Sequence, residues 1–287
     1  MKQIIYFLQY IGFIFIYFLY KILPLNLSLK VSSFLFRTFG KFSRANKTAI
    51  NNCKYVFPNL KDEEIQNIIK KSWNNLGITI CELLRINDIF IKNKIKYINI
   101  ENIEDFIKSK KQAIFISIHQ SNWEVLVPGL DRIGINIGGI YRHINNNFID
   151  KLILNIRQNS LVSKNSFYTP KGKKSAKDVV DAINNSLSIV LLIDQKDSSG
   201  EEVMFFNKKV KTQTGFLKIA RKYNLPIIPI QNKRITNGNI ELTFLEPLYH
   251  NNLEINDTQM MEEIHNKIEQ WIKAEPSQWF WQHKRFS

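Results

Sequence analysis

One histidine and one glutamate, five positions apart, carry the clearest chemical signal in the sequence. His119 directly follows the apolar run at 113–118, and Glu124 ends the segment QSNWE that comes next. A histidine at a strand end can act as a general base when a carboxylate accepts the proton on its other ring nitrogen and so fixes the tautomer. We expect Glu124 to be that carboxylate, in the first turn of the following helix. The alternative for the same spacing is a histidine that only packs at the end of a strand.

Other reaction types lack the residues that they need. The five histidines show no metal-ligand spacing, and the pattern H-E-x-x-H is absent. No G-x-S-x-G turn provides a serine nucleophile, so the attacking hydroxyl has to come from a substrate. The segment PKGKKS at 170–175 lacks the upstream glycine of a phosphate loop, and no dinucleotide fingerprint follows a strand. We therefore expect neither a bound metal nor a resident cofactor.

Short apolar runs alternate with helical stretches through the middle of the chain. Such alternation predicts an α/β fold with a mostly parallel central sheet, flanked by helices on both faces. Ligands in such sheets bind beyond the carboxyl ends of the strands, which is where His119 falls. The expected strands are residues 113–118, 137–142, 187–194 and 225–230, and the expected helices are residues 123–133, 147–158, 174–185 and 214–223.

Further elements are predicted on either side of this alternation. Apolar residues recur every three or four positions over 62–86, which predicts a long helix, and a short helix is expected over 102–110. Asn237-Gly238 is typical of a tight turn into a strand at 240–245, which we expect to lie antiparallel at an edge of the sheet. A last helix is predicted over 257–274.

The amino terminus forms a separate hydrophobic unit. Residues 4–20 are 17 residues without a charge, flanked by lysines. At about 1.5 Å per residue, a helix of this length approaches the thickness of a bilayer core. We expect a membrane-anchor helix over 1–23, spanning the bilayer or lying in its interface, rather than a core helix or a cleaved signal. Residues 24–287 then form one domain, with a helical, membrane-proximal front end over 24–100.

The net charge of +15 is concentrated in the front of the chain. Residues 1–61 hold nine basic residues and no acidic one. By the positive-inside rule this asymmetry places residues 24–287 in the cytoplasm, and the same stretch favours contact with anionic lipid. No nucleic-acid recognition motif accompanies the charge, so we expect no nucleic-acid partner. Cys53 and Cys81 fit free thiols in a reducing compartment.

Several motifs, in order along the chain, point to one family. They are H-x4-E at His119–Glu124, Tyr141-Arg142-His143, Asp194-Gln195, Phe205-Phe206, Arg234 after the strand at 225–230, and a terminal pattern of Glu275, Pro276, Gln278, Trp279, Trp281, His283 and Arg285. On these residues the sequence resembles the bacterial lipid A biosynthesis acyltransferases, the lauroyl and myristoyl transferases of the wider lysophospholipid and glycerolipid acyltransferase superfamily. The resemblance covers essentially the whole chain. It departs at Asn207, where relatives carry glycine, and at 145–147, where a proline is common.

This resemblance implies a glycerolipid-acyltransferase-like fold and an O-acyltransferase of lipopolysaccharide biosynthesis. Such an enzyme moves a fatty acyl chain from acyl carrier protein to a hydroxyl of an anionic lipid A precursor of the Kdo-lipid IVA type, at the bacterial inner membrane. The donor is a thioester, so no cofactor is implied. His119 would be the general base and Glu124 its stabilising carboxylate, with Arg142 or backbone N–H groups as oxyanion donors. The residues expected to bind substrate are Arg142, Asp194, Gln195, Arg157 and Arg234.

Two other functions remain alternatives. The first is acylation of another membrane lipid, a lysophospholipid or a glycolipid, by the same residues. The second is a non-catalytic membrane lipid-binding protein of the same fold, which would have no need of His119. The terminal aromatic residues Trp279, Phe280 and Trp281 also have two interpretations, an interfacial patch or a core closed over the last helix.

Overall fold

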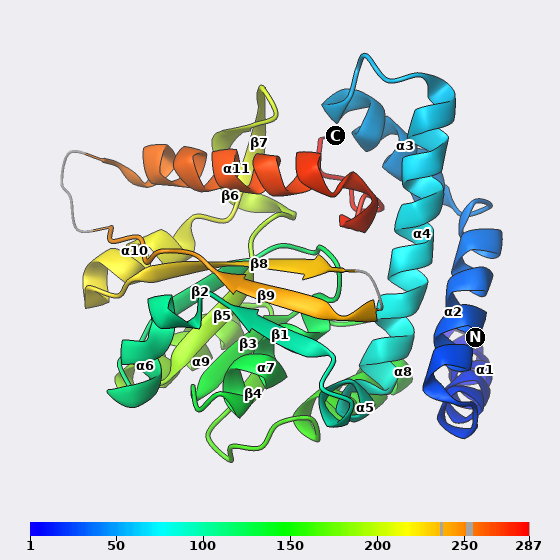
Figure 1. Cartoon of the computed structure of the whole chain (residues 1–287), viewed down its shortest axis with the longest axis horizontal. Coiled ribbons are helices and arrows are strands. Elements are labelled where there is room, and N and C mark those ends of the chain that lie inside the picture. Colours follow the sequence, from blue (N-terminus) through cyan, green and yellow to red (C-terminus); the bar gives the residue numbers. More distant parts are fainter. Residues whose placement is uncertain (236–237, 251–254, 287) are drawn as a thin grey trace.

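Seven strands form one sheet at the centre of the molecule (Figure 1). The structure is a computed structural model that describes residues 1–235, 238–250 and 255–286. The strand order is β1-β9-β8-β2-β5-β3-β4, and every neighbouring pair is parallel except β8 with β9. The predicted α/β fold with a mostly parallel sheet is therefore confirmed. The strands are β1 Ile95–Ile98, β2 Ile114–Ser117, β3 Ile137–Tyr141, β4 Phe167–Pro170, β5 Ser188–Leu192, β8 Ile227–Arg234 and β9 Ile240–Phe244.

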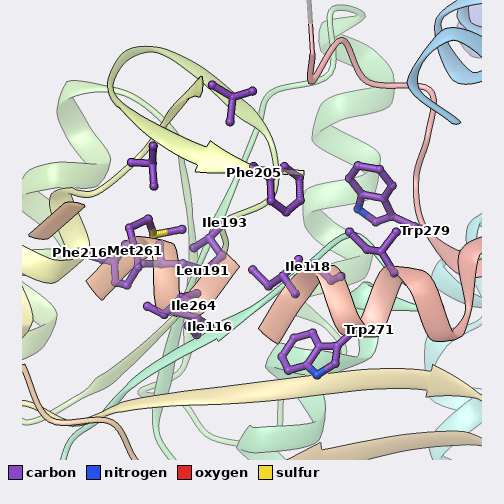
Figure 2. Close-up of a cluster of buried hydrophobic side chains, with 14 of the residues drawn as sticks. Ile116, Ile118, Leu191, Ile193, Phe205, Phe216, Met261, Ile264, Trp271 and Trp279 are labelled. Carbon is purple, nitrogen blue, oxygen red and sulfur yellow. The ribbon is translucent and has the colours of Figure 1, made fainter. Parts of the chain in front are cut away.

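Each face of the sheet is covered by its own apolar core. In β2, Ile114 and Ile116 belong to one core and Phe115 to the other, because side chains alternate along a strand. Figure 2 shows the first core, where Ile116 lies near Ile264 beneath the last long helix. Since both faces are covered, the central strands are apolar throughout, which is why their sequence runs were recognisable.

Helices from the second half of the chain cover the first core, and shorter helices cover the second. Residues of α9 to α11 pack in the first core, together with α3 and α4, whereas α5 to α7 pack in the second. The helices that follow the front end are α5 Ile86–Ile91, η1 Ile100–Ile103, α6 Glu104–Lys108, η2 Trp123–Val125, α7 Leu126–Arg132, α8 Asn147–Gln158, α9 Lys173–Asn184, α10 Gly215–Tyr223, α11 Asp257–Ala274 and η4 Pro276–Gln278.

Four helices form the front end: α1 Lys2–Ile22, α2 Leu25–Gly40, α3 Arg44–Val56 and α4 Asp62–Leu84. In Figure 1, α4 stands across the side of the sheet toward which β8 points, with α2 packed against it. Gly77 lets these two helices meet closely, because a Cβ there would lie 2.7 Å from the carbonyl oxygen of Ser32. The Ser32 hydroxyl donates to the carbonyl of Gly77 at 2.6 Å. The long helix is thereby fixed where it crosses the ends of the parallel strands.

The predicted anchor residues form the single helix α1, which is long and apolar enough to cross a membrane. Its outer side exposes large apolar side chains, among them Ile4, Leu8 and Phe15. Its inner side contacts the rest of the protein: the Asn146 side chain donates to the carbonyl of Tyr6 at 2.8 Å. Near its other end, Tyr20 is buried.

Three features of the strands differ from the expectations. The strand at 240–245 is antiparallel as predicted, but it is internal, since β1 pairs along its outer side. The short strands β1 and β4 were not predicted, and neither was the antiparallel hairpin of β6 Lys196–Phe205 and β7 Lys208–Thr212. The predicted turn at Asn237-Gly238 lies partly outside the described residues.

Candidate active site

A cavity of about 520 Å³ opens where three adjacent parallel strands end. The strands β2, β5 and β3 are neighbours in the sheet, and His119, Gln195 and Arg142 follow them in that order. Parallel strands bring their carboxyl ends to one edge, so residues far apart in the sequence meet there. All three side chains line the cavity. Its apolar wall consists of Leu126, Val127, Gly139, Ile140, Val190 and Leu192.

His119 takes its carboxylate partner from the end of β5. Its Nδ1 lies 2.7 Å from Oδ1 of Asp194, and its main-chain N–H donates to Oδ2 of the same residue at 3.1 Å. Its Nε2 lies 3.2 Å from the side-chain amide nitrogen of Gln195. With the Nδ1 proton donated to Asp194, Nε2 keeps its lone pair and can take a proton from a substrate.

Asp194 is buried and held on both carboxylate oxygens. The indole N–H of Trp279 donates to its Oδ2 at 2.7 Å. Burial raises the pKa of the Asp194 carboxyl, but the charge of His119 and the hydrogen bonds from His119 and Trp279 outweigh burial, so the pKa lies below its ordinary value. The ionised carboxylate therefore keeps the imidazole proton on Nδ1.

Glu124 has a different partner from the one that its spacing predicts. Its carboxylate accepts hydrogen bonds from Nε and Nη2 of Arg157, at 2.8 and 2.7 Å, and from the indole of Trp123 at 3.1 Å. Both ring nitrogens of His119 face other groups, so the expected hydrogen bond between His119 and Glu124 is wrong for this structure. The physical reason is that α8 brings a guanidinium, which matches a carboxylate in two-point contact, while β5 brings Asp194 to the histidine.

The basic side chains that line the cavity differ in whether they are already paired with a carboxylate. Arg157 is engaged by Glu124, whose charge outweighs burial and raises the pKa of the guanidinium above its ordinary value. Lys171 donates to Asp197 at 2.9 Å. Arg142 is exposed and has no hydrogen bond or ion pair with any described residue. Of the three arginines expected to bind substrate, Arg142 is therefore the one whose guanidinium is available.

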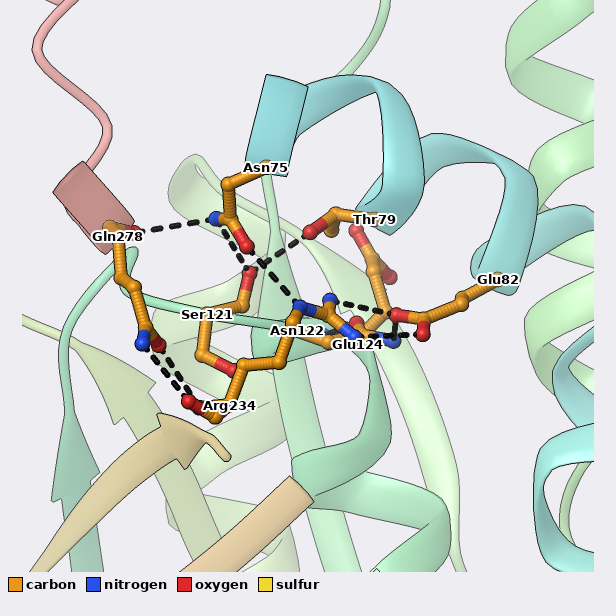
Figure 3. Close-up of polar contacts among 8 residues, drawn as sticks. All are labelled: Asn75, Thr79, Glu82, Ser121, Asn122, Glu124, Arg234 and Gln278. Atoms are coloured by element: carbon orange, nitrogen blue, oxygen red, sulfur yellow. Dashed lines mark hydrogen bonds and ion pairs between the residues drawn. The ribbon is translucent and has the colours of Figure 1, made fainter. Parts of the chain in front are cut away.

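Arg234 lies outside this cavity. Its Nη1 and Nη2 donate to the two carboxylate oxygens of Glu82 at 2.6 and 2.7 Å, and its Nε donates to Asn75 at 3.1 Å (Figure 3). Because the whole guanidinium is engaged by α4, the geometry does not support the expected contact of Arg234 with substrate. Arg234 instead ties β8 to the long helix.

The same face of α4 holds the loop that follows His119. Asn75 and Thr79 donate to the carbonyl of Ser121 at 3.2 and 2.7 Å, and Glu82 accepts from the amide of Asn122 at 2.8 Å (Figure 3). Ser121 has a φ of 53°, a region that residues with a side chain rarely adopt. These contacts therefore keep an unfavourable turn in place. Sequence reasoning missed Glu82, although a carboxylate inside the apolar run of a helix signals a buried partner.

The carboxyl-terminal segment closes the site on its other side. The main-chain N–H of Phe280 donates to the carbonyl of His119 at 2.9 Å. Trp279 and Trp281 are 3% and 0% exposed. Of the two interpretations of these aromatic residues, the core is what the structure shows, and Trp279 additionally holds the carboxylate partner of His119.

Within the described ranges, no cluster of three or more histidine, cysteine or carboxylate side chains could hold a metal ion.

Comparison with known proteins identifies a family that this chain matches. The family described as bacterial lipid A biosynthesis acyltransferase matches residues 1–287. Among solved structures, the 1-acyl-sn-glycerophosphate acyltransferase PlsC from Thermotoga maritima matches at 15% sequence identity with a TM-score of 0.40, over 87% of this chain and 96% of that one. No protein with a curated description matches.

Proposed function

This chain belongs to the bacterial lipid A biosynthesis acyltransferase family, and we propose that it transfers a fatty acyl chain from the thioester of acyl carrier protein to a hydroxyl of an anionic lipid A precursor of the Kdo-lipid IVA type. The observation that carries the proposal is a histidine whose Nδ1 lies 2.7 Å from the Asp194 carboxylate and whose Nε2 faces a cavity with an apolar wall and a free guanidinium. Acyl transfer to a lipid hydroxyl needs each of these parts.

The reaction starts at Nε2 of His119. A substrate hydroxyl donates its proton to this nitrogen while its oxygen attacks the thioester carbonyl carbon. The tetrahedral intermediate collapses, the carbon–sulfur bond breaks, and the imidazolium returns the proton to the departing thiolate. Asp194 stabilises the imidazolium between these steps, and general-base assistance of this kind contributes about 10²–10⁴-fold.

The cavity offers separate places for the two ends of the substrates. Its apolar wall, along β3, β5 and α7, suits the acyl chain of the donor. Arg142 at the exposed side suits a phosphate of the acceptor, because a guanidinium binds phosphate oxygens in two-point contact. Glu124 acts here by holding Arg157 on the wall rather than by touching His119.

We place the protein on the cytoplasmic face of the inner membrane, with α1 lying in the interface. This position is supported by the contacts of α1 with the domain near both of its ends, at Tyr6 and at Tyr20. A helix that crosses the bilayer would have to leave the domain along most of its length, whereas an interfacial helix keeps one side on the protein and turns its apolar side to lipid. Asn146, which holds α1, lies four residues after Arg142, so acceptor lipid can reach the cavity from the membrane side.

The acyl carrier protein donor is supported by the family and by charge. Acyl carrier proteins are acidic, and the net charge of +15 favours their encounter with this protein. The donor brings the activated carbonyl as a thioester, so the chain's own residues supply proton transfer and positioning.

The proposal is tested by mass spectrometry of lipid A from cells that lack this protein and carry either the parent or His119→Ala. We expect the deletion to remove one secondary acyl chain and only the parent to restore it. His143→Ala is the matched control, because it removes a second histidine–aspartate pair, with Asp150 at 2.6 Å, outside the cavity lining. Unchanged lipid A in the deletion strain, with altered phospholipids or glycolipids, would move the acceptor to another membrane lipid.

A further inference from the structure

The side chain of Gln195 lies where the reacting atoms must meet. Its amide nitrogen is 3.2 Å from Nε2 of His119, and both residues line the cavity. A general base works within about 2.6–3.2 Å of the oxygen that it deprotonates. The amide therefore borders the position of the attacking oxygen. Because Nε2 has one lone pair, a hydroxyl that donates to it takes that lone pair from the Gln195 amide.

We infer that the Gln195 amide then donates to the oxyanion of the tetrahedral intermediate, an inference that rests on the proposed acyl transfer. When the hydroxyl oxygen bonds to the thioester carbon, the π electron pair of the carbonyl moves onto the carbonyl oxygen. The resulting oxyanion is bonded to the same carbon as the attacking oxygen. An amide displaced from Nε2 is next to this oxygen and has no other described partner. When the carbon–sulfur bond breaks, the carbonyl re-forms and the amide can return to His119.

Four main-chain N–H groups near His119 already donate to acceptors within the protein. An oxyanion hole needs N–H groups that point at the intermediate and have no other acceptor. The N–H groups of His119, Gln120 and Ser121 donate to Asp194, to the carbonyl of Ile118 and to the carbonyl of Gln278. The N–H of Glu124, at the start of the following helix, donates to the side chain of Asn122 at 3.0 Å. The N–H groups of His119, Gln120, Ser121 and Glu124 are therefore used inside the protein.

The charged donors of the cavity are also less suited. Arg157 is bound by Glu124 and Lys171 by Asp197. Arg142 lies at the exposed side, where it suits an acceptor phosphate. An amide that already contacts the base nitrogen is closer to the developing charge than these groups.

The backbone on both sides of Gln195 is anchored, which leaves its side chain to move. Asp194 is held by His119 and Trp279. On the other side, the N–H of Lys196 donates to Nε2 of His283 at 3.1 Å. Burial, together with neighbouring positive charges, lowers the pKa of His283 to about 4, so this ring is a neutral acceptor at physiological pH. Because the backbone on both sides is fixed, the Gln195 amide can exchange its hydrogen-bond partner while the residue stays beside His119.

The test is steady-state kinetics of the full-length protein with acyl carrier protein thioester and the lipid A precursor isolated from the deletion strain. Gln195→Met keeps the length of the side chain and removes the donor without adding charge. We expect kcat to fall about 10²–10³-fold, with both KM values within about threefold of the parent. Gln195→Asn, which keeps an amide on a shorter side chain, is expected to recover part of the loss.

Gln112→Met is the matched control for damage to the fold. The Gln112 amide donates to the carbonyls of Ile183 and Leu187 at 2.7 and 3.0 Å, before the start of β2 and away from the cavity. Its loss should lower the melting temperature and leave kcat unchanged.

Three results would overturn the inference: a kcat of Gln195→Met close to the parent, a change confined to KM, or an equal loss of kcat in Gln112→Met. A parent without activity on these substrates would instead refute the proposed function, so the two failures are distinguishable.

Discussion

Replacing Asp194 by asparagine changes one atom at the carboxylate partner of His119. The carboxylate accepts from His119 Nδ1 at 2.7 Å through Oδ1, and from Trp279 at 2.7 Å and the main chain of His119 at 3.1 Å through Oδ2. An asparagine has one acceptor oxygen and one donor nitrogen for these two positions. Its nitrogen must therefore face either Nδ1 or two fixed N–H donors.

The second orientation places three donors together, two of which cannot change. The first orientation needs only a shift of the imidazole proton from Nδ1 to Nε2, which lets Nδ1 accept from the amide. We expect the protein to adopt the first orientation. His119 then carries its proton on Nε2 and cannot take one from a substrate, and loss of the correct tautomer in a histidine–aspartate pair costs about 10⁴-fold in kcat.

The assay is single-turnover acyl transfer, combined with nitrogen NMR of the histidine rings. We expect the single-turnover rate constant of acyl transfer to fall about 10⁴-fold and the NMR signal of His119 to report a proton on Nε2. Asp150→Asn is the matched control, since Asp150 accepts from His143 Nδ1 at 2.6 Å and from the N–H of Ile144 at 2.8 Å. The same chemical change there should leave the His119 tautomer unaltered.

Two results would refute the reasoning. If Asp194→Asn kept near-parental kcat and Glu124→Gln lost about 10⁴-fold together with the His119 tautomer, Glu124 would be the partner in solution, as the spacing alone predicts. A loss of kcat in Asp194→Asn with the proton still on Nδ1 would also contradict the tautomer argument.

The remaining predictions concern the cavity, the exposed guanidinium of Arg142 and a buried histidine. Gly139→Ala places a Cβ 2.6 Å from a side-chain carbon of Val127, so we expect shorter acyl chains in the product by mass spectrometry; unchanged chain length would contradict the placement of the donor chain. Arg142→Met should raise KM for the phosphorylated acceptor about tenfold or more with little change in kcat, and an effect on donor KM alone would argue against a phosphate contact. Burial, aided by the charge of Arg285, lowers the pKa of His265 to about 3 in the folded protein. As the pH falls from about 6.5 to about 3, the unfolded chain therefore binds a proton that the folded protein does not bind. The free energy of unfolding should then fall by about 1.4 kcal/mol for each unit by which the pH is lowered. Denaturant unfolding of His265→Gln should lack this slope, and an unchanged slope would assign it to another group.

The central sheet was predictable because its strands are covered on both faces. Burial on both sides makes a strand apolar throughout, and such runs, separated by periodic helices, were visible at β2, β3, β5 and β8. The hairpin β6–β7 was not, because much of it is exposed and polar, with a segment such as KDSSGEE that has no apolar pattern. The edge strands β1 and β4 are four residues each and only partly buried, so their signal is weak.

The position of the site was predictable from the sequence, and so were some of the residues that form it. A histidine after a buried parallel strand falls at the edge where ligands bind, and this argument needs only the order of elements along the chain. The motifs that carry the resemblance also brought Arg142, Asp194 and Gln195 to attention. The functions of these residues in the reaction remain predictions, which the experiments above address.

The sequence alone determined that a basic chain with an α/β sheet places His119 at the end of a strand. The tertiary structure decided which carboxylate reaches that histidine. Spacing within five residues favoured Glu124, but the adjacency of β2 and β5 delivers Asp194 from 75 positions further along. Pairing of strands and packing of α8 are long-range, and they decide which charges neutralise each other. For that reason Arg157 and Arg234, which were expected to bind substrate together with Arg142, are bound to Glu124 and Glu82 in the folded protein, and Arg142 is left open to a substrate.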